Sequence, residues 1–257
     1  MRVQCCMGIL NMLERQCARH MRKGIMGLRQ HYRENDMDIN AYMNELTARL
    51  KERFGERLVY VGLQGSFLRG EADDSSDIDA MVVLDELDAA ALDAYREVVE
   101  SLPHAERACG FICGRGELAG WSRGEACLLH HATRDIYGAL EPLLPRCTPE
   151  DVRDYARLSV GNMYHALCHR RVHAHTGRWR ETLADDYKGA FFVMQQAHWL
   201  RTGEFIATRA DMLKASQGMD AEVMRMAARL RAGEDVDGEA AFELLMAWCG
   251  QKLRELV

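Results

Sequence analysis

The sequence predicts an α+β fold, in which a mixed sheet with flanking helices is followed by an all-α helical bundle. Strand-like and helix-like segments alternate up to about residue 145, and only helical periodicity follows. Three of the four prolines cluster at this point, at positions 142, 145 and 149. We therefore expect an N-terminal extension over 1–36, an α+β domain over 37–145 and a helical bundle domain over 146–257.

The α+β domain is expected to contain five principal elements. Apolar residues at helical spacing alternate with short runs rich in Val, Leu and Tyr. The pattern predicts helices over 39–54 and 87–102 and strands over 58–63, 78–84 and 108–113.

The bundle is expected to contain helices and no strand. Thr148 can cap its first helix, and Pro149 suits the first helical position. Gly203 and Gly218 fit as helix ends. The predicted helices cover residues 151–169, 185–202, 208–217, 221–232 and 238–256.

The composition excludes several classes of protein. Of the 257 residues, 48% are hydrophobic and 28% are charged, which is typical of soluble globular chains and excludes a disordered or collagen-like one. No run of 18 uncharged apolar residues occurs, so we expect no transmembrane helix, and we recognise no secretory signal. The nine cysteines are odd in number and scattered, which favours the reducing cytoplasm.

Charge is distributed unevenly along the chain. Residues 37–145 contain ten basic and twenty acidic residues, in a chain of net charge −6. This acidic surplus disfavours a groove for a long nucleic acid and favours a metal centre or a cationic substrate, with a solvated acidic surface as the alternative. Residues 1–36 are basic, and two interpretations stay open for them: the physiological start is Met37, or they form an extra helix on the bundle.

The segment from Val61 to Leu84, VGLQGSFLRGEADDSSDIDAMVVL, carries the chemistry. Asp77 and Asp79 open its second strand and project from the same face, because side chains alternate along a strand. Two neighbouring carboxylates repel each other unless a cation lies between them. Mg²⁺ binds through a few carboxylates together with phosphate oxygens, so the pair predicts half of a metal–phosphate site.

Gly65 and Ser66 supply the other half. Glycine lets the backbone approach a phosphate closely, and a helix that starts at Phe67 would point free amides at the anion. Arg69 would add positive charge. Taken alone, Gly65-Ser66 fits an ordinary turn, and Asp77-x-Asp79 fits a solvated strand end. The two motifs together, each joined to an apolar strand, are more specific for a metal–phosphate site.

Gly65-Ser66 followed by Asp77-Ile78-Asp79 resembles the signature of nucleotidyltransferases of the DNA polymerase β superfamily. The resemblance implies transfer of a nucleoside monophosphate from a nucleoside triphosphate to an acceptor hydroxyl. It also implies that Asp77 and Asp79 hold Mg²⁺ and that a third carboxylate on a neighbouring strand completes the site. Two metal ions would then clamp the attacking and leaving oxygens while pyrophosphate leaves.

Four acids are candidates for the third carboxylate. By spacing it lies on the strand near 104–113, where Glu106 is the only acid. We expect Glu106 to be the third ligand or the general base, with Asp135 as the second choice and Glu117 and Glu125 as further candidates. A solvated strand edge is the alternative for Glu106.

The helical half resembles the C-terminal bundle of aminoglycoside adenylyltransferases, through the segment DDYKGAFFVMQQAHWLRTGEFIATRADML. The resemblance places the active site in the cleft between the domains and implies that Lys188 contacts the β- and γ-phosphates. A surface lysine on an amphipathic helix is the alternative. The loop predicted over 121–125 lines the acceptor pocket or packs on the surface.

Histidines gather at positions 165, 169, 173 and 175. Their helical spacing allows zinc, and Arg170 with His175 fits a loose ribonuclease pattern. A solvated helix end is the interpretation that we prefer.

The predicted function is Mg²⁺-dependent transfer of AMP from ATP to a hydroxyl of a small, cationic acceptor such as an aminoglycoside, with antibiotic resistance as the implied role. The sequence does not distinguish ATP from the other nucleoside triphosphates. Two alternatives are a protein adenylyltransferase of toxin–antitoxin type and a catalytically decayed nucleotide-binding protein. We expect no long nucleic acid and no membrane as a partner, and a homodimer is compatible with the resemblance.

Overall fold

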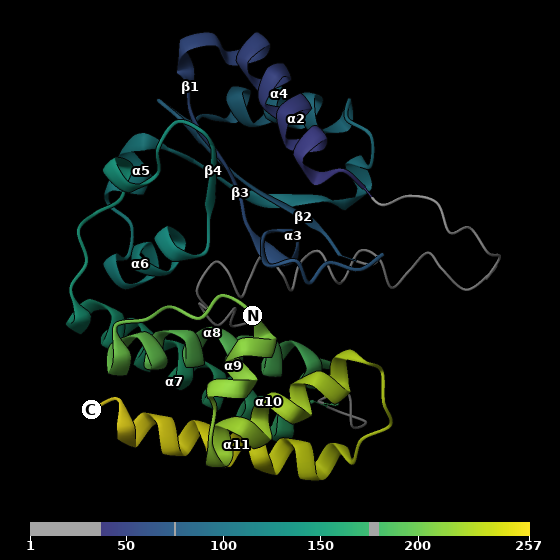
Figure 1. Ribbon diagram of the computed structural model, residues 1–257, viewed down its shortest axis with the longest axis vertical. Helices are drawn as coiled ribbons and strands as arrows, with labels where there is room; N and C mark the ends of the chain where they lie inside the picture. Colours follow the sequence, from purple (N-terminus) through teal and green to yellow (C-terminus); the bar gives the residue numbers. More distant parts are fainter. Residues whose placement is uncertain (1–36, 75, 175–179) are drawn as a thin grey trace, which may run out of the picture. The chain divides into compact units, whose positions relative to one another are not determined.

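The computed structural model describes residues 37–74, 76–174 and 180–257, and Figure 1 shows their course. Contacts divide the chain into two compact units. Of the described residues, those between 37 and 122 and between 129 and 146 form the sheet unit, and Arg123–Leu128 and those from Cys147 to Val257 form the helical unit. The predicted α+β architecture with a helical second part is confirmed, whereas the expectations for residues 1–36 lie outside the described residues.

The sheet unit contains a mixed four-stranded sheet in the order β3-β2-β1-β4. The strands are β1 (Leu58–Leu63), β2 (Ile78–Leu84), β3 (Ala108–Gly114) and β4 (Arg134–Tyr137). β1 pairs antiparallel with both β2 and β4, and β2 pairs parallel with β3. A parallel pair needs a crossover connection, which is supplied here by the helix between β2 and β3. The first three strands match the prediction, and β4 was missed.

Two helices cover one face of this sheet (Figure 1), α2 (Ile39–Phe54) and α4 (Ala89–Glu100). Each begins at an aspartate whose carboxylate accepts backbone N–H groups of the first turn, Asp38 for α2 and Asp88 for α4. We call the covered face the core face. Its buried strand residues pack in the main apolar cluster with α2 and α4: Leu58, Val61, Leu63, Ile78, Ala80, Val82 and Leu84.

The strand side chains that alternate with those of the core face point to the opposite face of the sheet, which we call the site face. Asp79 and Met81 lie on it, since their neighbours along β2 belong to the core face. Gly62 pairs with Met81 and therefore lies on the same face. Short helical segments complete the unit: η1 (Gly55–Arg57), α3 (Gly65–Arg69), η2 (Ala105–Arg107), α5 (Arg115–Ala119) and η3 (Glu141–Leu143).

In its described residues, the helical unit contains five long or medium helices and no strand. They are α7 (Pro149–His173), α8 (Leu183–Thr202), α9 (Arg209–Ala215), α10 (Gly218–Arg231) and α11 (Gly238–Glu255), and α6 (Arg123–His131) begins in this unit. Thr148 and Asp151 form a capping box at the start of α7, as the Thr-Pro signal predicts. No helix in the described part of the chain is both long and apolar enough to cross a membrane.

The two glycines predicted as helix ends differ in outcome. Gly203 ends α8 in the left-handed conformation, with φ of 77°. The prediction for Gly218 is wrong, because this residue begins α10 with φ of 52°. The chain leaves α9 after Ala215 and turns into the new helix at a backbone conformation that glycine adopts without steric strain.

Candidate active site

The site begins where β1 ends and α3 starts. Gln64 joins the two elements, and its backbone N–H donates to the carbonyl oxygen of Asp79 at 2.8 Å. Its buried side chain donates from Nε2 to Oγ1 of Thr133 at 2.8 Å. These bonds hold the turn after β1 against β2 on one side and against the residues before β4 on the other.

Gly65 directly contacts the carboxylate of Asp79. Its φ is +70°, and a Cβ added to it would lie 1.8 Å from Oδ2 of Asp79. Any side chain at this position would therefore collide with the carboxylate. The structure thus brings together one residue of each predicted motif, the glycine of the Gly-Ser turn and the second aspartate of Asp-x-Asp.

The helix after this turn begins at Gly65, two residues earlier than predicted. α3 spans only five residues and ends at Gly70, which has φ of 67°. Gln64 occupies the N-cap position and makes no side-chain capping bond, so no side chain caps the first amides of α3. Ser66 lies in this first turn, as the phosphate-binding hypothesis requires.

Arg69 is more enclosed than the prediction assumed. Its Nε lies 3.0 Å from Oε2 of Glu71, and the two side chains are only 8% and 13% exposed. The charge of Arg69 is thus partly balanced within the loop that follows α3. This contact favours a role in holding that loop, and the predicted phosphate contact of Arg69 stays a prediction.

Asp77 and Asp79 occupy the predicted positions at the start of β2. Asp77 directly precedes the strand and Asp79 is its second residue, and both are half-buried. Because side chains alternate along an extended backbone and these residues are two positions apart, their side chains point to the same side of the sheet. Carboxylate oxygens are ligands suited to Mg²⁺, which is commonly bound by one or two carboxylates together with phosphates of the substrate.

Glu106 does not lie where the sequence predicts. β3 begins at Ala108, and Glu106 lies before it on η2, because His104 adopts a left-handed φ of 60° and turns the chain. Its side chain is 74% exposed, and its charge acts on Tyr42 of α2, whose pKa is raised first by burial and then by Glu106. The placement of Glu106 on the strand is therefore wrong, and Tyr42 belongs to the apolar cluster of the core face.

The residue beside Asp79 on the neighbouring strand is Cys109. The parallel register pairs Ile78 with Ala108 and Asp79 with Cys109, and paired residues point to the same face. A thiol is a softer ligand than a carboxylate and is not a typical Mg²⁺ ligand. Within residues 37–74, 76–174 and 180–257, no three His, Cys, Asp or Glu side chains are close enough together to hold a metal ion.

Asp135 lies on the site face, but two strands away from Asp79. It pairs with Gly62, which in turn pairs with Met81. Two strand spacings amount to about 10 Å, which is too far for Asp135 and Asp79 to share one ion. The hydroxyl of buried Tyr60 donates to Oδ1 of Asp135 at 2.7 Å and fixes the orientation of this carboxylate.

The two remaining acids lie on short helices. Glu117 is on α5, where its Oε2 would be 2.2 Å from a Cβ added to Gly114. Glu125 is on α6, is buried, and raises the pKa of Tyr155 of the helical unit, an effect second to burial of the phenol. Neither acid forms a metal-binding group of three in the described part of the chain.

Arg107 is a site residue that the sequence reasoning missed. Its Nε and Nη2 donate to the carbonyl oxygen of Ser76 at 2.9 and 2.8 Å, and Nη2 also donates to the carbonyl of Asp73 at 3.3 Å. The guanidinium lies 5.5 Å from the ring centre of Phe67 on α3. One side chain therefore joins the residue before Asp77 to the helix that begins at Gly65.

The remaining candidates belong to other parts of the fold. Lys188 lies on α8 of the helical unit, and its predicted phosphate contact stays a prediction. The loop predicted over 121–125 is wrong in part, because α6 starts at Arg123. Trp121 packs edge-to-face on Phe111, with ring centres 5.2 Å apart.

The histidines at 165, 169 and 173 lie exposed along α7, in agreement with a solvated helix face. Arg170 of the ribonuclease-like pattern pairs with buried Asp186. The other member of that pattern, residue 175, lies outside the described residues.

Comparisons with known proteins support the assignment of the sheet unit. The family model described as "Nucleotidyltransferase domain" matches residues 43–107, a range that contains Gly65, Ser66, Asp77 and Asp79. Spectinomycin adenyltransferase AAD(9) from Enterococcus faecialis, solved with ATP and spectinomycin, is similar over 83% of this chain and 98% of that chain, with a TM-score of 0.55 and 15% identity.

A toxin–antitoxin structure with AMP-PNP is similar over 50% of this chain and 92% of that chain, at 20% identity, but its TM-score of 0.30 is too low to indicate a shared fold. No curated protein sequence matches the chain. The prediction of a nucleotidyltransferase is confirmed, because residues 43–107 match the model of a nucleotidyltransferase domain and the fold of the chain is similar to that of the spectinomycin adenyltransferase.

Proposed function

We propose that this protein transfers AMP from ATP to a hydroxyl of a small acceptor and releases pyrophosphate, in a reaction that depends on Mg²⁺. The observation that carries the proposal is the contact between Gly65 and the carboxylate of Asp79. This contact brings the turn that would bind the phosphates next to the carboxylate that would bind the metal ion. Nucleotidyl transfer requires this combination.

Asp77 and Asp79 would hold the magnesium ion. Their oxygen atoms suit this ion, and two carboxylates leave coordination positions for triphosphate oxygens and water. When bound, Mg²⁺ supplies positive charge that balances the charge developing on the phosphates.

The backbone of Gly65 and Ser66 would bind the triphosphate through the uncapped amides of α3. Lys188 of α8 is our candidate for a further phosphate contact from the helical unit. Arg107 and Arg69 hold the loop between the two motifs, through the carbonyl of Ser76 and the carboxylate of Glu71 respectively.

Asp135 is our candidate for the acceptor side of the site. It lies on the same face of the sheet as Asp79, and Tyr60 orients its carboxylate. Because β4 and β2 are about 10 Å apart, Asp135 would contact an acceptor rather than the metal. A cationic acceptor agrees with the acidic surplus of residues 37–145 and with the spectinomycin present in the similar adenyltransferase structure.

The experiment is a search for the adenylylated product. The protein is incubated with Mg²⁺ and each of the four nucleoside triphosphates, together with aminoglycosides, aminocyclitols and simple polyols. Mass spectrometry then records the mass of each acceptor. A gain of one nucleoside monophosphate names both substrates, whereas unmodified acceptors across the panel would contradict a small-molecule acceptor of these classes.

One observation favours a second candidate, a nucleotide-binding protein without transferase activity. Cys109 occupies the position beside Asp79 where a third carboxylate would complete the site. This candidate predicts Mg²⁺-dependent binding of ATP with no pyrophosphate released in the presence of any acceptor. A protein acceptor, the cytoplasmic location and the homodimer stay predictions.

A further inference from the structure

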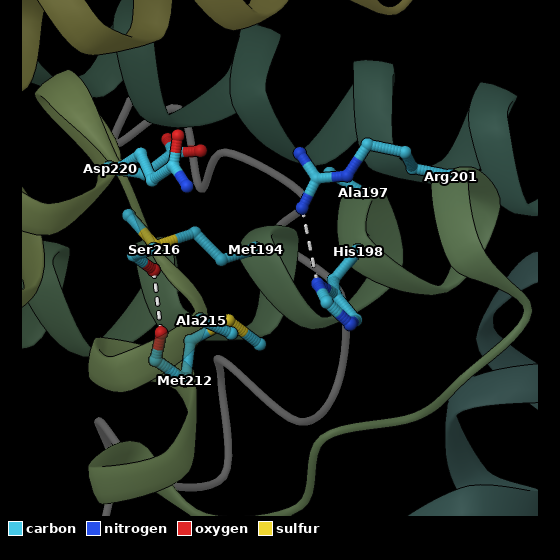
Figure 2. A pocket seen from close by; sticks show the side chains of 9 residues that line it. Met194, Ala197, His198, Arg201, Met212, Ala215, Ser216 and Asp220 are labelled. Atoms are coloured by element: carbon cyan, nitrogen blue, oxygen red, sulfur yellow. Dashed lines mark hydrogen bonds between the residues drawn. The ribbon is translucent and has the colours of Figure 1, made fainter.

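A cavity of about 380 Å³ lies within the helical unit, and none of the residues discussed for nucleotidyl transfer lines it. Figure 2 shows side chains from α8 on one wall and from the start of α10 on another, with α9 between them in the chain. Pockets for small molecules typically measure about 300–1,000 Å³, so this cavity has room for a small organic ligand.

Two basic side chains of α8 form one wall of this cavity. Nη2 of Arg201 lies 3.2 Å from Nδ1 of His198, and both side chains line the cavity (Figure 2). Because a guanidinium only donates, Nδ1 of His198 accepts, which leaves the proton of the neutral ring on Nε2. Both residues therefore present donors.

The charge of Arg201 has no acidic partner within 4.0 Å among residues 37–74, 76–174 and 180–257. The acid on the opposite wall, Asp220, is already paired. Its carboxylate accepts from Nε1 of Trp248 at 2.7 Å and from Nζ of Lys252 at 2.9 Å. The pairing of Asp220 with Lys252 leaves Arg201 without an ion pair among the residues that line the cavity, and the carboxylate of Glu255, outside the lining, acts on Arg201 from a greater distance.

The start of α10 and two methionine side chains also line the cavity. α10 starts beside the cavity, and its N-cap residue Gln217 makes no side-chain capping bond, so the first amides add partial positive charge. Met194 and Met212 contribute apolar surface (Figure 2). Methionine side chains adapt their shape to irregular ligands.

We propose that this cavity binds a small organic anion, whose phosphate or carboxylate group is held by Arg201 and His198 and whose apolar part contacts Met194 and Met212. Guanidinium groups bind both kinds of oxyanion through paired hydrogen bonds. The site lies within the helical unit and does not depend on the nucleotidyl transfer proposed above.

NMR of the histidine ring signals in the full chain tests this proposal. The signal of His198 is assigned by its loss in His198→Gln. Inorganic phosphate and acetate are titrated separately at constant ionic strength, because exposed charges are screened by salt. We expect one of the two anions to shift the His198 signal saturably, and the stronger of the two identifies the head group.

Arg201→Met should weaken this binding by about tenfold or more, the loss of one charge-assisted hydrogen bond. Arg225→Met is the matched control, since Arg225 is an exposed arginine of α10 outside the cavity lining, and it should bind as the wild type does. If the methionine variant is unstable, Arg201→Lys replaces it; this variant keeps the charge but loses the paired guanidinium hydrogen bonds, so it should also bind the anion more weakly than Arg225→Met does. An unmoved His198 signal with both anions, or equal affinity in the Arg201 and Arg225 variants, would overturn the proposal.

Discussion

Replacing Gly65 with alanine should separate the geometry of the site from the stability of the fold. Gly65 has φ of +70°, and its added Cβ would lie 1.8 Å from Oδ2 of Asp79, where real Cβ atoms essentially never approach within 3.0 Å. The left-handed backbone costs alanine about 1–2 kcal/mol. Relief of the collision requires the carboxylate to move by more than about 1 Å, and such a misplacement can lower a rate by about 100-fold.

Gly70→Ala is the matched control. Gly70 also has a left-handed φ, +67°, but an added Cβ there would meet nothing within 4 Å. The two variants should therefore lose similar stability, since the backbone strain is the same in kind. Only Gly65→Ala should also lose about two orders of magnitude in kcat/KM.

Thermal unfolding and pyrophosphate release measure the two effects. A loss of 1 kcal/mol lowers Tm by about 2–4 °C in a chain of this size. Full activity in Gly65→Ala, or an equal loss of activity in both variants, would refute the contact between the turn and the carboxylate as the source of the effect.

Three further predictions concern other contacts. Arg107→Met removes the hydrogen bonds to the carbonyls of Ser76 and Asp73 and should raise the Mg²⁺ concentration needed for half-maximal activity about tenfold. A Mg²⁺ titration with an unchanged midpoint would contradict a role of Arg107 in positioning Asp77. Tyr60→Phe removes the 2.7 Å bond to Asp135 and should lower the free energy of unfolding by about 1.5–3 kcal/mol, as measured by urea denaturation; no change would mean that water replaces the phenol. Burial, and then the charge of His130, lowers the pKa of His131 below its usual 6.5. As the pH is lowered, the unfolded chain therefore binds a proton at this residue before the folded chain does, so the stability present above about pH 6.5 should fall. Urea denaturation between pH 7.5 and 5.5 should show a smaller fall in the free energy of unfolding for His131→Gln than for the wild type.

Periodicity was sufficient to predict most of the fold. The helices over 39–54 and 185–202 and the strands over 58–63 and 78–84 have clear apolar faces, and the structure has them within two residues of the predicted bounds. β4 was missed because it has only four residues, Arg134–Tyr137, two of them charged and exposed. Its place in the sheet is determined by pairing with β1, a contact that no local pattern shows.

The site was predicted less completely, because its details depend on register. The Gly-Ser turn and Asp-x-Asp are local motifs, and the contact of Gly65 with Asp79 follows from the strand connection between them. The position beside Asp79 depends on how β2 and β3 align. The left-handed residue His104 and the turn η2 move the start of β3 to Ala108, so that Cys109 and not Glu106 pairs with Asp79. No sequence pattern marks that alignment.

Pyrophosphate release from ATP tests most directly whether Asp79 supports nucleotidyl transfer. The assay compares the wild type, Asp79→Asn and Asp93→Asn, with Mg²⁺ and the acceptor panel. Asp93 is an exposed aspartate of α4 that pairs with Arg96, and its replacement should leave the rate unchanged. We expect acceptor-dependent release that is abolished in Asp79→Asn only. No release by the wild type, or equal release by the two variants, would contradict it.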